Sequence, residues 1–241
     1  MTPYWQSDDG SHVLYNADCL DVLPTLAPGS VDAVVTDPPY GIAHPCNYRD
    51  RGRGPLAKAN NYADVVGDNK RFDPSPFLSL NLPTVLWGGN WFADRLPASG
   101  GWLVWDKERP DTLDQATCEL AWTNCVKGVR RFRHLWNGFM KASEIGESYH
   151  PTQKPVALIV WALSLKWLVG LQTILDPFTG SGTTGVACIR TGRRFIGVEI
   201  SREYCDIAVR RMENELAQPF LPGIDPAKRE TTQDLFAETT P

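Results

Sequence analysis

The sequence predicts an α/β fold built on a doubly wound, parallel sheet. Short apolar runs typical of buried strands alternate with helix-like segments, and this alternation favours parallel strands joined by crossover helices. The apolar run Val31–Thr36 leads into Asp37-Pro38-Pro39-Tyr40, and a second strand-like run leads into the glycine-rich string Asp176–Gly182. Open α/β sheets bind their ligands at the carboxyl ends of such strands.

In the first half of the chain, strands are expected where a short apolar run is bounded by turn residues. Pro28-Gly29 ends the first helix, and Gly88-Gly89 closes the third strand. Residues 41–76 are rich in Gly, Pro, Asn and Arg and are too long for a plain connection, which is typical of a functional or a disordered loop. The elements expected here are strand 12–15, helix 18–26, strand 31–36, strand 84–87, helix 91–96, strand 102–105 and strand 118–123.

In the second half, helix boundaries are marked by residues that favour them. Pro155 begins an apolar helix that Gly170 stops, and Gly192 stops the next one. Ser201 is expected to cap the last helix, whose apolar residues recur at helical spacing to about Leu216. The elements expected are helix 155–169, strand 173–175, helix 183–190, strand 195–198 and helix 201–216.

Composition indicates a globular protein that needs no membrane and no metal. The chain is 42% hydrophobic and 22% charged, which is ordinary for a globular protein. The six cysteines form no C-x-x-C pair or other metal spacing, so reduced thiols and a cytoplasmic location are expected. Met1–Gly10 is too polar for a signal peptide, and the apolar run 156–169 is too short to span a bilayer.

Charge is distributed unevenly along the 241 residues. Residues 213–241 contain six acidic and two basic residues and so account for the whole net charge of −4. We therefore expect a single domain at 1–218, followed by a loose acidic tail at 219–241.

Two segments, 49–58 and 127–141, are locally basic within residues 1–212, which carry no net charge in total. Basic residues interleaved with aromatic rings suit phosphates and bases, so candidate DNA-recognition loops are placed at 41–76 and 107–149. Solvated surface loops would show the same charges, so the pattern alone does not decide between the two. The candidate DNA-binding residues are Arg49, Arg51, Arg53, Lys58, Arg130, Arg131, Arg133 and Trp136.

The glycine string has the form G-x-G-x-x-G over Gly180–Gly185, after a strand and at the start of a helix. Glycines let the backbone approach a ligand closely, and the acid Glu199 at the end of the next strand can hold ribose hydroxyls. This pattern predicts a nucleoside cofactor and leaves NAD and S-adenosylmethionine open. No Gly-Lys-Ser/Thr follows, which disfavours a nucleoside triphosphatase.

The string Asp37–Tyr40 suits capture of a flat base that carries an amine. The amine lone pair of adenine N6 or cytosine N4 is delocalised into the ring, so acceptors on its N–H groups are needed to localise it. Asp37 and the carbonyl of Pro38 are such acceptors, the fixed φ of proline stiffens the direction of that carbonyl, and Tyr40 offers a face for stacking. The target base would have to leave the duplex to reach them. An ordinary Asp-Pro-Pro turn is the alternative.

These residues carry a family resemblance. Asp37-Pro38-Pro39-Tyr40 resembles the catalytic motif of DNA amino-methyltransferases, and Asp176–Gly182 resembles their cofactor motif. His150–Pro155 and Gly197–Ile200 are similar to two further segments of that family. The catalytic motif precedes the cofactor motif, which is the permuted order of the β class. The resemblance implies a seven-stranded sheet with helices on both faces and one antiparallel strand near its edge.

The same resemblance implies roles for individual residues and a cofactor, S-adenosylmethionine. The catalytic residues would be Asp37, Pro38, Pro39 and Tyr40. The cofactor-binding residues would be Asp18, Cys19, His150, Thr152, Gln153, Lys154, Asp176, Phe178, Gly180, Ser181, Gly182, Thr183 and Glu199.

The expected activity is methylation of adenine N6 in double-stranded DNA by base flipping. An aspartate at the head of the catalytic motif suggests adenine, since serine there is more typical of cytosine-N4 enzymes. The alternatives are a cytosine-N4 enzyme, transfer to RNA or a protein glutamine, and a non-catalytic nucleic-acid-binding subunit. Pro45-Cys46 lacks the rest of a cytosine-C5 motif, so Cys46 is interpreted as a loop cysteine. The small size also suggests a homodimer or a minimal phage- or prophage-type enzyme. The family resemblance implies a restriction-modification system as the setting.

Overall fold

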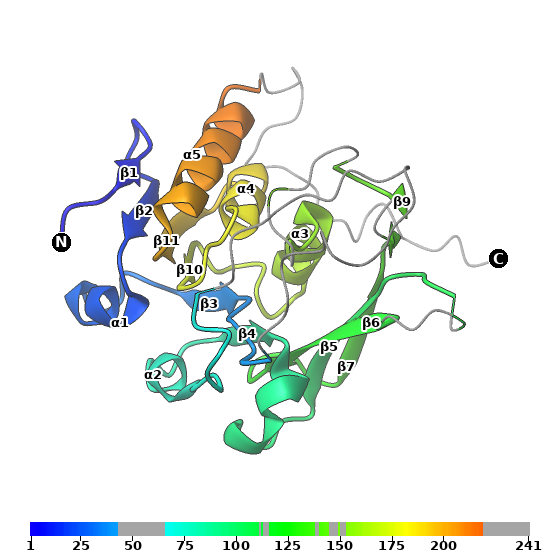
Figure 1. Ribbon diagram of the computed structural model, residues 1–241. Helices are drawn as coiled ribbons and strands as arrows, with labels where there is room; N and C mark the ends of the chain where they lie inside the picture. The colour runs from blue at the N-terminus through cyan, green and yellow to red at the C-terminus, as the bar shows by residue number, and fades with distance from the viewer. Residues whose placement is uncertain are drawn as a thin grey trace.

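The computed structural model describes residues 1–42, 66–110, 112, 116–137, 140–144, 149 and 153–218. Within them the main sheet has nine strands in the order β1-β2-β11-β10-β3-β4-β6-β5-β7 (Figure 1). These strands are β1 (Trp5–Gln6), β2 (His12–Asn16), β3 (Ala33–Thr36), β4 (Thr84–Trp87), β5 (Gly101–Asp106), β6 (Cys118–Thr123), β7 (Val129–Arg133), β10 (Thr173–Asp176) and β11 (Arg194–Glu199). A separate small hairpin pairs β8 (Trp136–Asn137) with β9 (Met140–Lys141).

The predicted parallel sheet is present in its central part. Strands β2, β11, β10, β3 and β4 are parallel neighbours. The expectation of seven strands with one antiparallel strand near the edge differs from what is observed. Both β1 and β6 are antiparallel, and β6 lies inside the sheet between β4 and β5. The permuted motif order stays a prediction, because strand order alone does not test it.

Two of the strands absent from the sequence prediction lack the signal on which it relies. β1 has only two residues and is held by pairing with β2. β7 carries three arginines with only Val129 and Phe132 as apolar residues, so it has no apolar run and was interpreted as part of a loop. The expected recognition loop 107–149 therefore contains β6 and β7, which are two strands of the main sheet.

Helices cover both faces of the sheet (Figure 1). The helices α3, α4 and α5 pack on one face, whereas α1, α2 and η2 lie on the other. Their bounds are α1 (Cys19–Val22), η1 (Leu23–Thr25), α2 (Ser75–Leu78), η2 (Gly89–Arg95), α3 (Val156–Ser164), α4 (Thr183–Arg190) and α5 (Arg202–Leu216).

Three helix predictions need adjustment. The expected helix 18–26 is α1 followed by the 3₁₀ turn η1, in which Pro24 occupies the first turn. The expected helix 91–96 is the 3₁₀ segment η2. The expected helix 155–169 ends at Ser164, because Leu165 adopts an extended conformation with ψ 139°, although the later Leu168 is still buried. Ser201 caps α5 as predicted.

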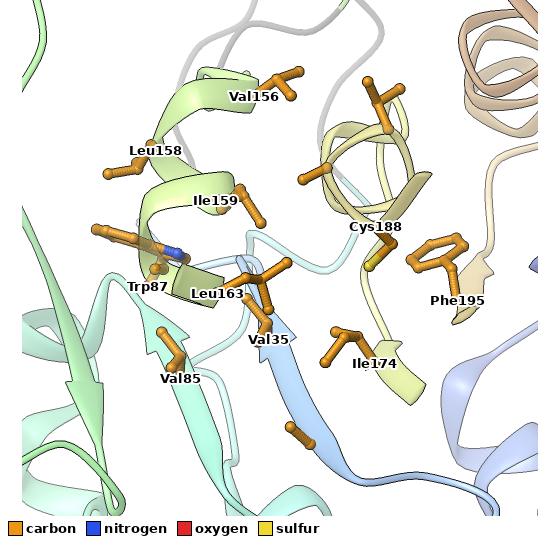
Figure 2. Close-up of a cluster of buried hydrophobic side chains, with 14 of the residues drawn as sticks. Val35, Val85, Trp87, Val156, Leu158, Ile159, Leu163, Ile174, Cys188 and Phe195 are labelled. Carbon is orange, nitrogen blue, oxygen red and sulfur yellow. The ribbon is translucent and has the colours of Figure 1, made fainter. Parts of the chain in front are cut away.

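The core between α3, α4 and the sheet positions the site (Figure 2). Leu158 and Leu163 of α3 are fully buried among Val35, Val85 and Ile174 of three adjacent strands. This packing places the start of α3, and the residues just before it, at the carboxyl edge of the central strands.

No helix within the described ranges is long and apolar enough to cross a membrane. The same ranges contain no group of three His, Cys, Asp or Glu side chains that could hold a metal ion. The acidic tail 219–241 lies outside the described residues.

Candidate active site

The two strings lie side by side at the carboxyl edge of the sheet. β3 leads into Asp37–Tyr40, β10 ends at Asp176, and these strands are parallel neighbours. From β10 the chain passes through α4 to β11 on one side, whereas from β3 it passes through α2 to β4 on the other. The strand order therefore reverses between β3 and β10. Such a switch point is where open α/β sheets bind ligands.

Both strings line one cavity of ≈ 1030 Å³. Its other walls come from α1, η2, the β5–β6 region and the segment before α3. Residues that line it outside the two strings include Asp18, Trp91, Lys107, Glu119, Lys154 and Glu199. The volume lies at the upper end of the range of small-molecule sites, so the cavity has room for more than one ligand group.

The glycine turn contains two glycines with different tasks. Gly180 and Gly182 have φ angles of +51° and +85°, which other residues rarely adopt. A Cβ on Gly182 would lie 2.9 Å from Cα of Ala208 in α5, whereas a Cβ on Gly180 would meet nothing within 4 Å. Gly182 thus allows α4 and α5 to pack closely, and Gly180 leaves open space in which a ligand can approach the backbone.

Two acids, the partly buried Glu199 and the buried Asp176, stabilise this turn. Glu199 at the end of β11 accepts hydrogen bonds from Gly180 N and Ser201 N, each at 2.8 Å. Burial raises the pKa of Glu199, although the backbone hydrogen bonds oppose this. Asp176 accepts from Thr36 Oγ1 at 2.6 Å and from Phe178 N at 3.1 Å, and burial raises the pKa of Asp176 to about 6.

The residues around the turn fit S-adenosylmethionine. Gly180 offers the open backbone, and Glu199 offers a carboxylate at a strand end, where it can accept bonds from ribose hydroxyls. Phe178 lines the cavity, as do Asp18 and Cys19 from α1. Asp18 also caps α1 by accepting a hydrogen bond from Leu20 N at 2.9 Å, so part of its role is to fix this wall.

The catalytic string is held in a network of short hydrogen bonds. Tyr40 donates its hydroxyl to Asp37 Oδ1 at 2.5 Å, and Lys154 Nζ donates to Asp37 Oδ2 at 2.5 Å and to the Tyr40 hydroxyl at 3.1 Å. The Tyr40 ring stacks on Trp91 with centroids 6.4 Å apart. A Cβ on Gly88, at the end of β4, would collide with the Tyr40 ring. The loop thus presents an oriented carboxylate beside an aromatic face.

A network of ion pairs connects Asp37 to charged residues of the β5–β6 region. Lys154 Nζ lies 2.9 Å from Glu119 Oε2, and Lys107 Nζ lies 2.5 Å from Glu119 Oε1. Burial raises the pKa of Asp37 although Lys154 opposes this. Burial alone would lower the pKa of Lys154, but the carboxylates of Asp37 and Glu119 hold it well above its ordinary value. The two lysines lower the pKa of Glu119 to about 2 against the effect of burial.

The segment before α3 differs from the expectation in one respect. Lys154 is predicted to bind the cofactor, but its ammonium group contacts Asp37, Tyr40 and Glu119. Gln153 accepts a hydrogen bond from Tyr149 N and donates to Glu144 Oε1, so it stabilises the segment. His150 and Thr152 lie outside the described residues.

Four charged residues that sequence reasoning missed complete the site. Glu119 and Lys107 belong to the network behind Asp37. Arg211 of α5 donates to Ser181 O at 2.7 Å and pairs with Glu144 at 2.9 Å, which ties the glycine turn to the segment before α3. A signal for Glu119 was present, because it is a charged residue inside an otherwise apolar predicted strand, Cys118–Thr123.

The candidate DNA-binding residues fall into three groups. Arg49, Arg51, Arg53 and Lys58 lie outside the described residues, as does Cys46. Arg130, Arg131 and Arg133 are exposed on β7. Trp136 is only 8% exposed and packs on Trp105 in the core, although it also lines the cavity. The arginines are therefore accessible, whereas Trp136 offers little free surface for stacking.

Comparison with known proteins adds a family match. Residues 88–210 match a family model described as DNA methylase. The type II methyltransferase M2.DpnII of Streptococcus pneumoniae is 44% identical, over 88% of this chain and 93% of that protein. The type II methyltransferase M2.LlaDCHI of Lactococcus lactis subsp. cremoris is 27% identical, over 87% of this chain and 91% of that protein.

Solved structures share the fold. The cytosine-N4-specific PvuII DNA methyltransferase matches with a TM-score of 0.58 at 15% identity, over 94% of this chain and 92% of that one. A complex of M1.HpyAVI with S-adenosylmethionine matches with a TM-score of 0.50 at 23% identity, over 83% of this chain and 99% of that one. The nine-stranded sheet is therefore of the α/β type found in DNA methyltransferases.

Proposed function

The chain belongs to the DNA methylase family, whose methyl donor is S-adenosylmethionine, and we propose that it methylates the N6 amine of adenine in double-stranded DNA. The observation that carries the proposal is that Asp37 and the glycine turn face one cavity at the switch point of the sheet. Methyl transfer requires the amine and the cofactor to meet. The carboxylate that binds the amine and the turn that binds the cofactor must therefore line the same cavity.

The catalytic string suits the target base. One oxygen of Asp37 and the Pro38 carbonyl can accept the two amine N–H bonds, which localises the nitrogen lone pair. The base must leave the duplex to reach this chamber, and the Tyr40 ring offers it a stacking face. As the N–C bond forms, one amine proton must leave, and Asp37 is the carboxylate placed to accept it.

Residues across the cavity would hold the cofactor. Gly180, Phe178 and Glu199 lie along one wall, with Asp18 and Cys19 beside them. When bound, S-adenosylmethionine supplies an electrophilic methyl group on a sulfonium centre. The contribution of the chain is to hold amine and cofactor in one fixed geometry, which lowers the entropic cost of the displacement.

The choice of adenine rests on Asp37 at the head of the catalytic string. The fold does not discriminate, since the structural neighbour of highest TM-score among those described above acts on cytosine N4. A cytosine-N4 enzyme is therefore the second candidate.

The setting of the activity is a further part of the proposal. The relatives are named type II methyltransferases, which supports pairing with a restriction endonuclease. The five cysteines of the described ranges are free thiols, as suits the cytoplasm. A homodimer and a phage origin stay predictions from the length of the chain.

The direct test is to incubate the protein with labelled S-adenosylmethionine and unmethylated duplex DNA, digest the DNA and identify the labelled nucleoside. We expect N6-methyldeoxyadenosine. Label on cytosine N4 would contradict the adenine assignment, and absence of cofactor binding, measured by calorimetry, would favour the non-catalytic subunit.

The variant Asp37→Asn tests the catalytic role with a side chain of nearly the same shape. We expect it to bind S-adenosylmethionine as the wild type does, measured by calorimetry, and to lose methyl transfer. Asp94→Asn, in an exposed ion pair with Arg71, is the matched control. An active Asp37→Asn variant would refute the role of Asp37 as the proton acceptor, and an active Asp37→Ala variant would refute its role as the hydrogen-bond acceptor for the amine.

A further inference from the structure

Four alternating charges extend from the catalytic loop into the antiparallel part of the sheet. They are Asp37 after β3, Lys154 before α3, Glu119 on β6 and Lys107 after β5. Each neighbour is in contact with the next: Asp37 with Lys154 at 2.5 Å, Lys154 with Glu119 at 2.9 Å, and Glu119 with Lys107 at 2.5 Å. The side chains of Lys154 and Lys107 are only 5% and 10% exposed.

Such an arrangement is not explained by stability. Removing charges from water costs several kcal/mol for each ion, and buried ion pairs are often no better than apolar residues of similar volume. Here the charges line the cavity that holds Asp37. A functional demand on Asp37 accounts for their position, whereas packing of the core does not require it.

Glu119 is the centre of the network because it binds both lysines with separate oxygens. Its Oε1 contacts Lys107 and its Oε2 contacts Lys154. The ammonium group of Lys154 is therefore fixed from two sides, by Glu119 and by Asp37. Lys154 in turn holds Oδ2 of Asp37, while Oδ1 is bound by the Tyr40 hydroxyl.

We propose that Glu119 is a positioning residue for methyl transfer, which acts through Lys154 to orient the carboxylate of Asp37. The inference rests on the proposed function, because it assigns Asp37 to the target amine. When the amine takes Oδ1, the Tyr40 hydroxyl must give way, and the bond from Lys154 to Oδ2 keeps the carboxylate in place. Glu119 keeps the Lys154 ammonium group beside Oδ2 of Asp37. It also neutralises part of the Lys154 charge, so that the Asp37 carboxylate remains a strong hydrogen-bond acceptor.

The charge of Glu119 affects the pKa of Asp37 in a direction that can be measured. The charged and titratable groups that face Asp37 are Lys154, Glu119 and Tyr40. Asp176 lies at the end of the neighbouring strand β10. The charge of Glu119 raises the pKa of Asp37, and Lys154 lowers it. Removal of the Glu119 charge therefore lowers the pKa of Asp37, and the acid limb of the kcat profile moves to lower pH.

The test compares Glu119→Gln with Glu215→Gln. Glu215 of α5 forms a two-point ion pair with Arg190 of α4, outside the cavity. For Glu119→Gln we expect kcat to fall by about 10- to 100-fold, the scale that misplacement of a catalytic group costs. We expect an unchanged Kd for S-adenosylmethionine and a shift of the acid limb of kcat to lower pH. Glu215→Gln is expected to change neither kcat nor its pH profile.

A readout without catalysis separates this inference from the proposed function. NMR of the lysine Nζ groups follows the protonation of Lys154 in the free protein, and we expect its pKa to fall in Glu119→Gln. If the wild type transfers no methyl group to DNA, the proposed function fails, and the Nζ signals still test the link between Glu119 and Lys154.

If Glu119→Gln unfolds because Lys107 is left buried without its partner, Glu119→Gln with Lys107→Gln is the second variant. It removes both members of that pair, and we expect it to fold with the same low kcat. A wild-type kcat in either variant, or an unchanged pH profile and Lys154 signal, would overturn the proposal.

Discussion

At the scale of single residues, the glycine turn separates packing from ligand binding. Gly182 faces Ala208 of α5, and Gly180 faces open space. We expect Gly182→Ala to destabilise the protein by about 2 to 4 kcal/mol, because it adds a left-handed residue and a clash. Gly180→Ala should cost only about 1 kcal/mol of stability. Urea unfolding measures both values.

Gly180→Ala, the variant with the smaller expected loss of stability, is the one expected to weaken cofactor binding. A methyl group on Gly180 enters the space where the ligand approaches, and we expect it to weaken S-adenosylmethionine binding by about tenfold, which is roughly 1.4 kcal/mol. Calorimetry on the folded Gly180→Ala variant measures this. Wild-type affinity there would mean that the cofactor does not approach the backbone at Gly180.

Residues that follow a strand end were predictable, and residues that meet across the sheet were not. Asp37, Gly180 and Glu199 each lie at or just after the end of an apolar run, so position in the sequence was enough to place them at one edge. Glu119 and Lys154 are 35 positions apart, and their contact depends on β6 lying beside β4. No periodicity in a single sequence contains that information.

At the scale of elements, one buried ion pair ties three segments together. Glu144 pairs with Arg211 of α5 at 2.9 Å, and its second oxygen accepts a hydrogen bond from Val156 N at the start of α3. The two side chains are 10% and 8% exposed. The pair thus joins α5 to the segment that carries Lys154.

We expect Glu144→Ala to lower the free energy of unfolding by about 3 to 5 kcal/mol, because it leaves a buried guanidinium without this carboxylate. Asp94→Ala removes the partner of Arg71 in a pair whose side chains are 61% and 54% exposed, and should cost about 1 kcal/mol or less. Urea unfolding at neutral pH compares them. Equal losses would show that Glu144 does not hold these segments together.

Elements with a periodic or capped pattern were predicted well, and elements made by pairing alone were not. The N-cap of α5 and the apolar runs of β3, β4 and β10 are local properties, so sequence reasoning found them. β7 is rich in arginine and exists because its backbone pairs with β5. Helix α3 is shorter than its apolar run because Leu165 adopts an extended conformation after Ser164. Leu168 is still buried, but it lies in a separate turn in which Leu168 N and Val169 N donate to Leu165 O.

At the scale of the whole molecule, the direction of the strands determines which arginine side chains of β7 lie near the edge of the sheet that carries the cavity. β5 and β4 run in the same direction, since both are antiparallel to β6, and β7 is parallel to β5. The carboxyl end of β7 therefore lies on the same edge of the sheet as the cavity. Arg133 is at that end, whereas Arg130 is three residues earlier, or about 10 Å along the strand.

The surroundings of the two arginines support the same distinction. Arg133 is 60% exposed and lies 3.5 Å from Asp106 and 3.4 Å from Glu108, at the carboxyl end of β5. The guanidinium of Arg130 lies over the Trp167 ring at 5.3 Å, beyond the end of α3. We therefore expect Arg133 to contact a DNA phosphate, and Arg130 to make no such contact.

Each phosphate contact contributes about 0.9 to the slope of log affinity against log salt concentration. Arg133→Ala should therefore weaken DNA binding and reduce that slope by about one, while Arg130→Ala should leave it unchanged. Fluorescence anisotropy with a labelled duplex over a series of salt concentrations measures both. A larger loss of slope in Arg130→Ala would place the DNA on the face of α3 instead of the carboxyl edge. Because the two variants remove the same charge from the same strand, a difference between them reports position and not net charge.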